Sequence, residues 1–97
     1  MKNLTPQQKE LFTLVVKHQV YAFRAADDYG KFSPEYKISV AALGAVKAAF
    51  KIMVPEIDCK TLENEVLSAA SVKYEYIKDN AWEYLGVREV VLATPIY

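Results

Sequence analysis

The chain has 97 residues, 53% of them hydrophobic and 25% charged, and its 12 basic residues balance 12 acidic ones. A chain of this length forms one small domain, and without a basic excess it is poorly suited to neutralising phosphates, which argues against a nucleic-acid-binding role. A single cysteine excludes an intramolecular disulfide, and the polar opening residues do not resemble a secretory signal, so we expect a cytoplasmic protein.

Three stretches of the chain carry helix start and stop signals. Thr5 followed by Pro6 and Gln8 has the pattern of a capping box with a proline in the first turn. A serine–proline pair opens the second stretch, Asp58 or Thr61 caps the third, and a glycine or a proline follows each stretch. The predicted helices span residues 6–29, 34–54 and 59–85.

The predicted helices are joined by short connections, which place consecutive helices side by side in opposite directions. The sequence therefore predicts an all-α fold, an up-down-up antiparallel three-helix bundle forming a single domain over residues 1–97. The segment 87–97 is ambiguous, because Val87, Val90 and Val91 fit a helical turn whereas Pro95 suits an extended chain. We expect either a short C-terminal helix or an extended tail there.

The first predicted helix has an unusually wide apolar surface. At 100° per residue, its apolar side chains cover more than half of the circumference. One neighbouring helix cannot cover an arc of that width, so we expect this helix to contact both of the others. Its predicted core face consists of Leu11, Leu14, Val15, Ala22, Ala25, Ala26 and Tyr29, flanked by Phe12, Tyr21 and Phe23.

His18 is the only histidine in the chain, and it falls within this apolar arc. Asp27 lies on the opposite face and Asp28 is well off the line of His18, so neither carboxylate orients the imidazole. Val15 occupies the position where a di-iron bundle carries a glutamate. We therefore expect a core or interface histidine bonded to a tyrosine or a backbone carbonyl. A ligand-binding or catalytic pocket that uses His18 and Tyr21 is the alternative.

The second predicted helix is apolar around most of its circumference, a pattern typical of a buried helix. A narrow stripe of Lys37, Lys47 and Lys51 interrupts the apolar surface beside Gly44. Small residues, Gly44 and Ala48 among them, recur every four positions and let helix axes approach closely, either to the first helix or to a symmetry mate. The helix is too short and too charged to span a membrane, but a lysine-edged helix lying on an anionic membrane surface is an alternative.

The third predicted helix combines a regular core face with aromatic residues outside it. Val72 and Tyr76 form a second patch at the edge of the core face, and Trp82 points in nearly the opposite direction, among polar residues. Tryptophan contributes strongly to binding where it is desolvated, so Trp82 is either an interface anchor or a residue covered by the tail. The predicted core face consists of Leu62, Val66, Leu67, Ala70, Tyr74, Ile77, Ala81, Tyr84 and Leu85.

No group of residues has the spacing of a catalytic, metal or cofactor site. The three glycines are isolated, so no phosphate-binding loop is present, and one histidine with one cysteine gives no metal signature. Cys59 is the single candidate nucleophile; the dipole of the third predicted helix would favour its thiolate, whereas Asp58 beside it opposes the thiolate. We therefore expect no enzyme activity, no metal and no cofactor.

The charges are shared unevenly between the second and third predicted helices. Residues 34–54 carry three lysines and one glutamate, whereas residues 58–85 carry three lysines and six acidic residues. Each exposed pair between opposed helices is worth only about 0–1 kcal/mol, so the asymmetry favours an orientation rather than stability.

Together these features predict a small helical protein–protein interaction module. The excess apolar surface indicates self-association, as a homodimer, or binding to another protein, with no nucleic acid partner. A peripheral membrane-surface protein using residues 34–54 and a ligand-binding or catalytic bundle using His18 remain alternatives. The predicted interface residues are Trp82, Tyr76, Val72, Gly44, Ala48, Lys47 and Lys51.

Overall fold

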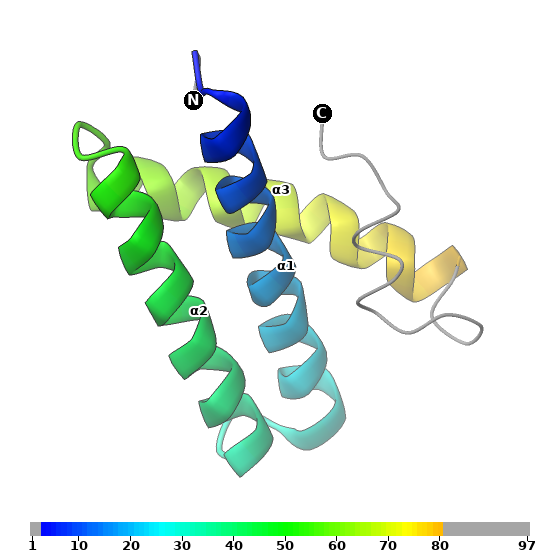
Figure 1. Cartoon of the computed structure of the whole chain (residues 1–97). Helices are drawn as coiled ribbons and strands as arrows, with labels where there is room; N and C mark the ends of the chain where they lie inside the picture. Colours follow the sequence, from blue (N-terminus) through cyan, green and yellow to red (C-terminus); the bar gives the residue numbers. More distant parts are fainter. Residues whose placement is uncertain (1–2, 81–97) are drawn as a thin grey trace.

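A computed structural model describes residues 3–80 of the chain, which form three helices: α1 (Pro6–Tyr29), α2 (Pro34–Met53) and α3 (Cys59–Asn80). α1 and α2 run side by side in opposite directions, and α3 runs across this pair (Figure 1). α1 packs against both α2 and α3. The predicted all-α three-helix bundle, and the prediction that the first helix contacts both others, are thus confirmed. The predicted segment 87–97 lies outside the described residues.

The start of α1 is fixed by a reciprocal capping box. The backbone N–H of Gln8 donates to Thr5 Oγ1 at 3.2 Å, and the backbone N–H of Thr5 donates to Gln8 Oε1 at 2.9 Å. The Gln8 amide also donates to the carbonyl oxygen of Met53 at 3.2 Å, so the first turn of α1 is tied to the end of α2. Gly30 ends α1 with a φ of 88°, a conformation that favours glycine.

The two later helices begin at side-chain caps. Ser33 Oγ accepts a hydrogen bond from the backbone N–H of Tyr36 at 3.1 Å at the start of α2. At α3, the backbone N–H of Thr61 donates to Asp58 Oδ1 at 2.7 Å, which identifies Asp58 as the cap. These local hydrogen bonds explain why the predicted helix starts are correct at all three helices.

The core forms where α1 meets the two other helices. The ring of Phe12 packs on Phe50 of α2, with centroids 5.9 Å apart, and the ring of Phe23 packs on Tyr74 of α3 at 5.6 Å. Aromatic rings bury more apolar area than any other side chains, and they set the sides of α1 that face its neighbours. The buried hydrophobic cluster consists of Phe12, Val15, Val16, Val20, Ala22, Leu43, Phe50, Val54, Leu62, Val66 and Ala70.

The core face of α1 is rotated from the one that the sequence predicts. Val15, Ala22 and Ala25 are buried, as predicted. Val16 and Val20, outside the predicted face, are also fully buried, whereas Tyr29, within the predicted face, is exposed. The prediction was wrong here because it treated the aromatic residues as flanks. α2 and α3 contact α1 on the side that carries Phe12 and Phe23, so the valines of that side are enclosed.

α2 is much less buried than its composition predicts. Within the described residues, Leu43 and Phe50 are the only buried residues of this helix. The described part of the chain therefore does not bury the second helix by itself, and the alternative that a symmetry mate packs on it stays a prediction. The physical reason for the exposure is the path of α3, which leaves one side of the α1–α2 pair uncovered and is joined to α2 through side chains such as Lys47 and Glu63. On α3 itself, the core positions Leu62, Val66 and Ala70 are buried, as predicted.

Candidate interaction surface

The side of α2 that points away from α1 and α3 is an exposed apolar surface, which we call the outward α2 face. Ile38 and Ile52, one at each end of it, expose 71% and 80% of their surface. On this side of the helix, the positions between the two isoleucines are all occupied by alanines. These alanines are exposed, except for the half-buried Ala42. The outward α2 face consists of Ile38, Ala41, Ala42, Ala45, Ala48, Ala49 and Ile52.

The spacing of these residues makes the surface straight and flat at its centre. Ile38, Ala45 and Ile52 are seven positions apart, which is close to two helical turns, so they lie on one line along the helix. The alanines fill the adjoining positions on either side of that line. The result is a shallow strip with one large aliphatic side chain at each end.

Two of the three lysines of the α2 stripe, Lys47 and Lys51, face α3, whereas Lys37 is exposed. Lys47 Nζ donates to Glu63 Oε2 at 2.6 Å, and Lys51 Nζ lies 2.7 Å from the sulfur of Cys59, to which it donates. Both lysines are half-buried. Two of the predicted interface residues therefore lie at the contact between α2 and α3, and their positive charges are directed away from the outward α2 face.

Gly44 lies at the border of the outward α2 face, to which Ala48 belongs, and both residues are exposed. A Cβ atom added at Gly44 would meet no atom within 4 Å. A glycine inside a helix costs about 1 kcal/mol relative to alanine, and packing within the described residues gives no compensation for it. The position thus offers room for close approach by another molecule.

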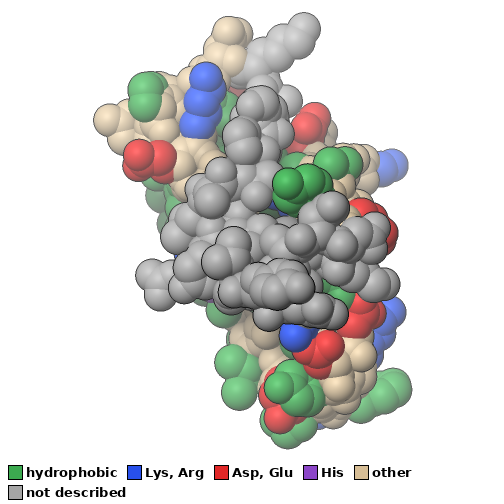
Figure 2. All heavy atoms as spheres, turned by 90° about the vertical axis from the view of Figure 1, so that its right-hand side faces the viewer, with side chains coloured by type: hydrophobic (Ala, Val, Ile, Leu, Met, Phe, Trp, Pro, Cys, Tyr) green, Lys and Arg blue, Asp and Glu red, His purple; other side chains and the backbone are tan. Residues whose placement is uncertain are grey.

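The remaining predicted interface residues belong to a different surface. Val72 and Tyr76 lie on α3 and are both exposed, as predicted. The side of the molecule seen in Figure 2 mixes hydrophobic side chains with acidic and basic ones over its described part. Trp82 lies outside the described residues, so its two predicted roles stay predictions.

The two residues of the polar site predicted on α1, His18 and Tyr21, contact each other through their rings. The imidazole of His18 packs edge-on against the ring of Tyr21, with centroids 5.6 Å apart, and both residues are half-buried. Burial, with a smaller contribution from the ammonium of Lys17, lowers the pKa of His18 below its ordinary value. Over residues 3–80, no three histidine, cysteine or acidic side chains gather in a way that could hold a metal ion.

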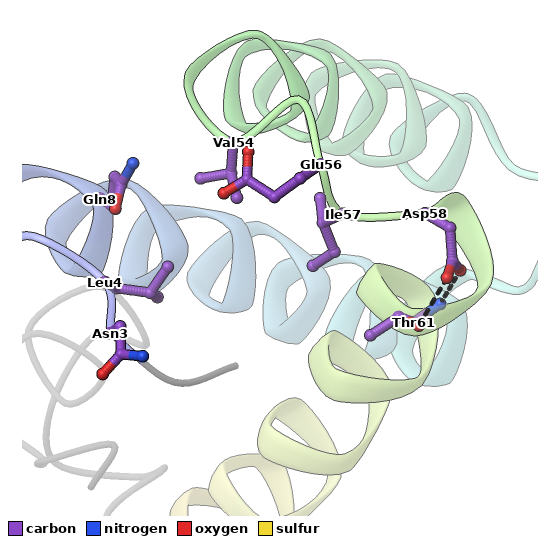
Figure 3. A pocket seen from close by; sticks show the side chains of 8 residues that line it. All are labelled: Asn3, Leu4, Gln8, Val54, Glu56, Ile57, Asp58 and Thr61. Carbon is purple, nitrogen blue, oxygen red and sulfur yellow. Dashed lines mark hydrogen bonds between the residues drawn. The ribbon is translucent and has the colours of Figure 1, made fainter.

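A hollow of about 420 Å³ lies between the start of α1 and the α2–α3 connection (Figure 3). Three of its polar side chains, those of Gln8, Asp58 and Thr61, form hydrogen bonds that cap the helices or join them. Gln8 bonds to Thr5 and Met53, and Asp58 accepts from both the backbone and the hydroxyl of Thr61, which lowers the pKa of its carboxyl group. The hollow lies at the end of the bundle, where these capping bonds hold the start of α1 and the α2–α3 connection in place. Its lining consists of Asn3, Leu4, Gln8, Val54, Glu56, Ile57, Asp58 and Thr61.

A second polar contact ties α3 to the C-terminal half of α1. The hydroxyl of Tyr74 donates to the carboxylate of Asp27, and the ring of Tyr74 packs on Phe23. Burial first, and then this hydrogen bond, raises the pKa of Tyr74 above its ordinary value. The arrangement keeps the phenol protonated and holds α3 in place.

Comparison of the chain with protein-family models, with curated proteins and with solved structures gave no match. In the part of the chain that the structure describes, no helix has both the length and the apolar character needed to cross a bilayer. The outward α2 face was not identified from the sequence, although the heptad spacing of Ile38, Ala45 and Ile52 would have indicated it.

Proposed function

We propose that the protein is a non-enzymatic helical interaction module that associates with a second copy of itself through the outward α2 face. The observation that carries this proposal is the exposure of Ile38 and Ile52 at the two ends of an uncharged alanine surface. Apolar surface of this kind is stabilised by removal from water, by about 25 cal/mol per Å². A continuous exposed strip of it is typical of an interaction site.

The positions of the lysines favour a protein partner over a membrane. Binding to an anionic bilayer depends on lysines that border the apolar face of a helix. Lys47 and Lys51 instead contact Glu63 and Cys59 of α3, which leaves Lys37 as the exposed lysine of α2. A flat uncharged strip is better suited to a second helix than to lipid headgroups.

The non-enzymatic part of the proposal is supported by the dispersion of reactive side chains. The single histidine and the single cysteine make separate contacts: His18 contacts Tyr21 on α1, whereas Cys59 accepts a hydrogen bond from Lys51 in the last turn of α2. General acid–base and nucleophilic catalysis need such groups within hydrogen-bonding reach of one another.

Sedimentation equilibrium of the full chain tests the proposal, from ~5 µM to ~500 µM, the range suited to a small interface. The variant Ile38→Lys with Ile52→Lys places a charge at each end of the outward α2 face. We expect the natural chain to dimerise with rising concentration and this variant to stay monomeric with unchanged helical circular dichroism.

Val72→Lys is the matched control, because Val72 is 74% exposed but lies on α3. We expect it to dimerise like the natural chain. A natural chain that stays monomeric throughout, or a lysine pair that leaves the dimer intact, would overturn the proposal. Flotation of a monomeric natural chain with anionic vesicles would also overturn it, in favour of the membrane-surface alternative.

A further inference from the structure

We infer that the second copy lies antiparallel on α2, with a two-fold axis close to Ala45, so that Ile38 of each copy packs on Ile52 of the other. This inference rests on the proposed function and adds the register and direction of the interface. A two-fold interface requires one surface that is complementary to itself.

The outward α2 face has the internal symmetry that such an interface needs. Ala45 is seven residues from Ile38 and seven from Ile52, so a rotation about Ala45 exchanges the two isoleucines. The same rotation places each of the remaining residues of the face, all of them alanines, opposite an alanine of the partner. The resulting pairs are Ile38 with the partner's Ile52, Ala41 with the partner's Ala48, Ala42 with the partner's Ala49, and Ala45 with the partner's Ala45.

The sizes of the side chains fit two helices that cross near Ala45. Small residues at the crossing point let the axes come closer than the usual separation of about 8–10 Å. Gly44, with open space around it, lies beside that point. Away from the crossing the axes diverge, and the exposed side chains of Ile38 and Ile52 fill the widening gap.

The charges at the two ends of α2 favour the antiparallel direction. Residues 31–37 carry two lysines and one glutamate, a net charge of +1, and residues 51–58 carry two acidic residues and one lysine, a net charge of −1. An antiparallel pair brings opposite charges together at both ends, whereas a parallel pair brings like charges together. The interaction between the two helix dipoles also favours the antiparallel arrangement. Exposed charges of this kind contribute little to affinity but select the orientation.

The area of the face indicates how strong the dimer is. The strip runs from Ile38 to Ile52, 14 residues apart, so it is about 21 Å long and about 10 Å wide, or about 210 Å² on each copy. An interface of this size is typical of weak, transient association rather than of a permanent dimer. We therefore expect dissociation in the micromolar range, within reach of the sedimentation experiment.

Cysteine cross-linking tests the direction and the register. All variants carry Cys59→Ser, which removes the native thiol, and each introduces one cysteine at an alanine of the outward α2 face, so both isoleucines are kept. Ala41→Cys is mixed with Ala48→Cys, one of them carrying a size tag, and oxidised above the dimer dissociation constant. A disulfide requires Cα atoms about 4.4–6.8 Å apart, so we expect the mixed disulfide to form in high yield.

Ala48→Cys mixed with Ala49→Cys is the matched control, because these positions meet only if the helices are parallel. Ala45→Cys, on the axis, is expected to cross-link with itself. A disulfide between positions 48 and 49 in place of the 41–48 pair would overturn the antiparallel direction and leave the proposed function standing. Dimerisation without any of these cross-links would overturn both the inference and the assignment of the interface to the outward α2 face. Absence of a dimer would overturn the proposed function itself.

Discussion

Replacing Phe50 or Ile52 by alanine distinguishes the two sides of α2. The two residues are two positions apart on one helix, but Phe50 is fully buried against Phe12, whereas Ile52 exposes 80% of its surface. In a monomer, the first substitution removes part of the core and the second changes only the solvent side. We therefore expect very different losses in the free energy of unfolding.

The magnitudes follow from the burial of each side chain. Truncation of a buried phenylalanine to alanine costs about 3–5 kcal/mol, because transfer energy is lost and a cavity is left. Full burial of an isoleucine is worth about 1.5–3 kcal/mol. Since Ile52 exposes 80% of its surface, Ile52→Ala forfeits about a fifth of that value, and the higher helix propensity of alanine offsets most of the loss. The expected cost of Ile52→Ala is thus below about 0.5 kcal/mol.

Urea unfolding followed by circular dichroism measures both costs, at ~1 µM protein, where the proposed weak dimer is dissociated. Because a small domain has about 5–15 kcal/mol of stability in total, Phe50→Leu serves as a milder variant if Phe50→Ala is too unstable to fold. A loss at Ile52 comparable to that at Phe50 in dilute protein would show that the chain itself covers the outward α2 face. The reasoning about self-association would then be refuted.

Four further substitutions test other parts of the structure. Gly44→Ala should raise the free energy of unfolding in dilute protein by up to about 1 kcal/mol, because the added Cβ meets no atom within 4 Å; a lower melting temperature would contradict this. Tyr74→Phe should cost about 1 kcal/mol through loss of its bond to Asp27, and Asp27→Asn should add little to that loss in a double-mutant cycle. Burial lowers the pKa of His18 in the folded chain from 6.5, so the unfolded chain binds a proton more readily. The folded chain should therefore lose stability as the pH falls below about 6.5, and His18→Gln should reduce that loss. A pH profile of stability that His18→Gln leaves unchanged would contradict the burial of the imidazole.

The ends of the helices could be predicted from the sequence because they depend on neighbouring residues. A threonine, a serine and an aspartate cap the three helices through hydrogen bonds that span three positions, and such bonds need no knowledge of the tertiary structure. Gly30 ends α1 for an equally local reason. These signals also fix the short connections, from which the bundle follows.

The orientation of each helix about its own axis could not be predicted in the same way. Periodicity shows that α1 has a wide apolar arc, but the side on which Phe50 and Tyr74 meet it is decided by tertiary packing. The fully buried Val16 and Val20 were therefore missed. α1 carries more apolar residues than the core needs, so several rotations of the helix about its axis would each turn an apolar side toward the core.

The same ambiguity hid the outward α2 face. When nearly every side of a helix is apolar, the pattern does not show which side meets the core and which is left in solvent. The lysines drew attention to their own side, yet Lys47 and Lys51 contact α3. Of the predicted small residues, Ala48 belongs to the exposed surface and Gly44 borders it, but Ile38 and Ile52 at its ends were not distinguished from core residues.

Concentration-dependent NMR of the natural chain tests the central claim most directly. Backbone amide shifts recorded at increasing protein concentration report which residues enter a new contact. We predict saturable shift changes along residues 38–52, largest near Ala45, with Val72 and Tyr76 unaffected. Spectra that do not change with concentration, or changes centred on α3 with α2 silent, would contradict self-association through the outward α2 face.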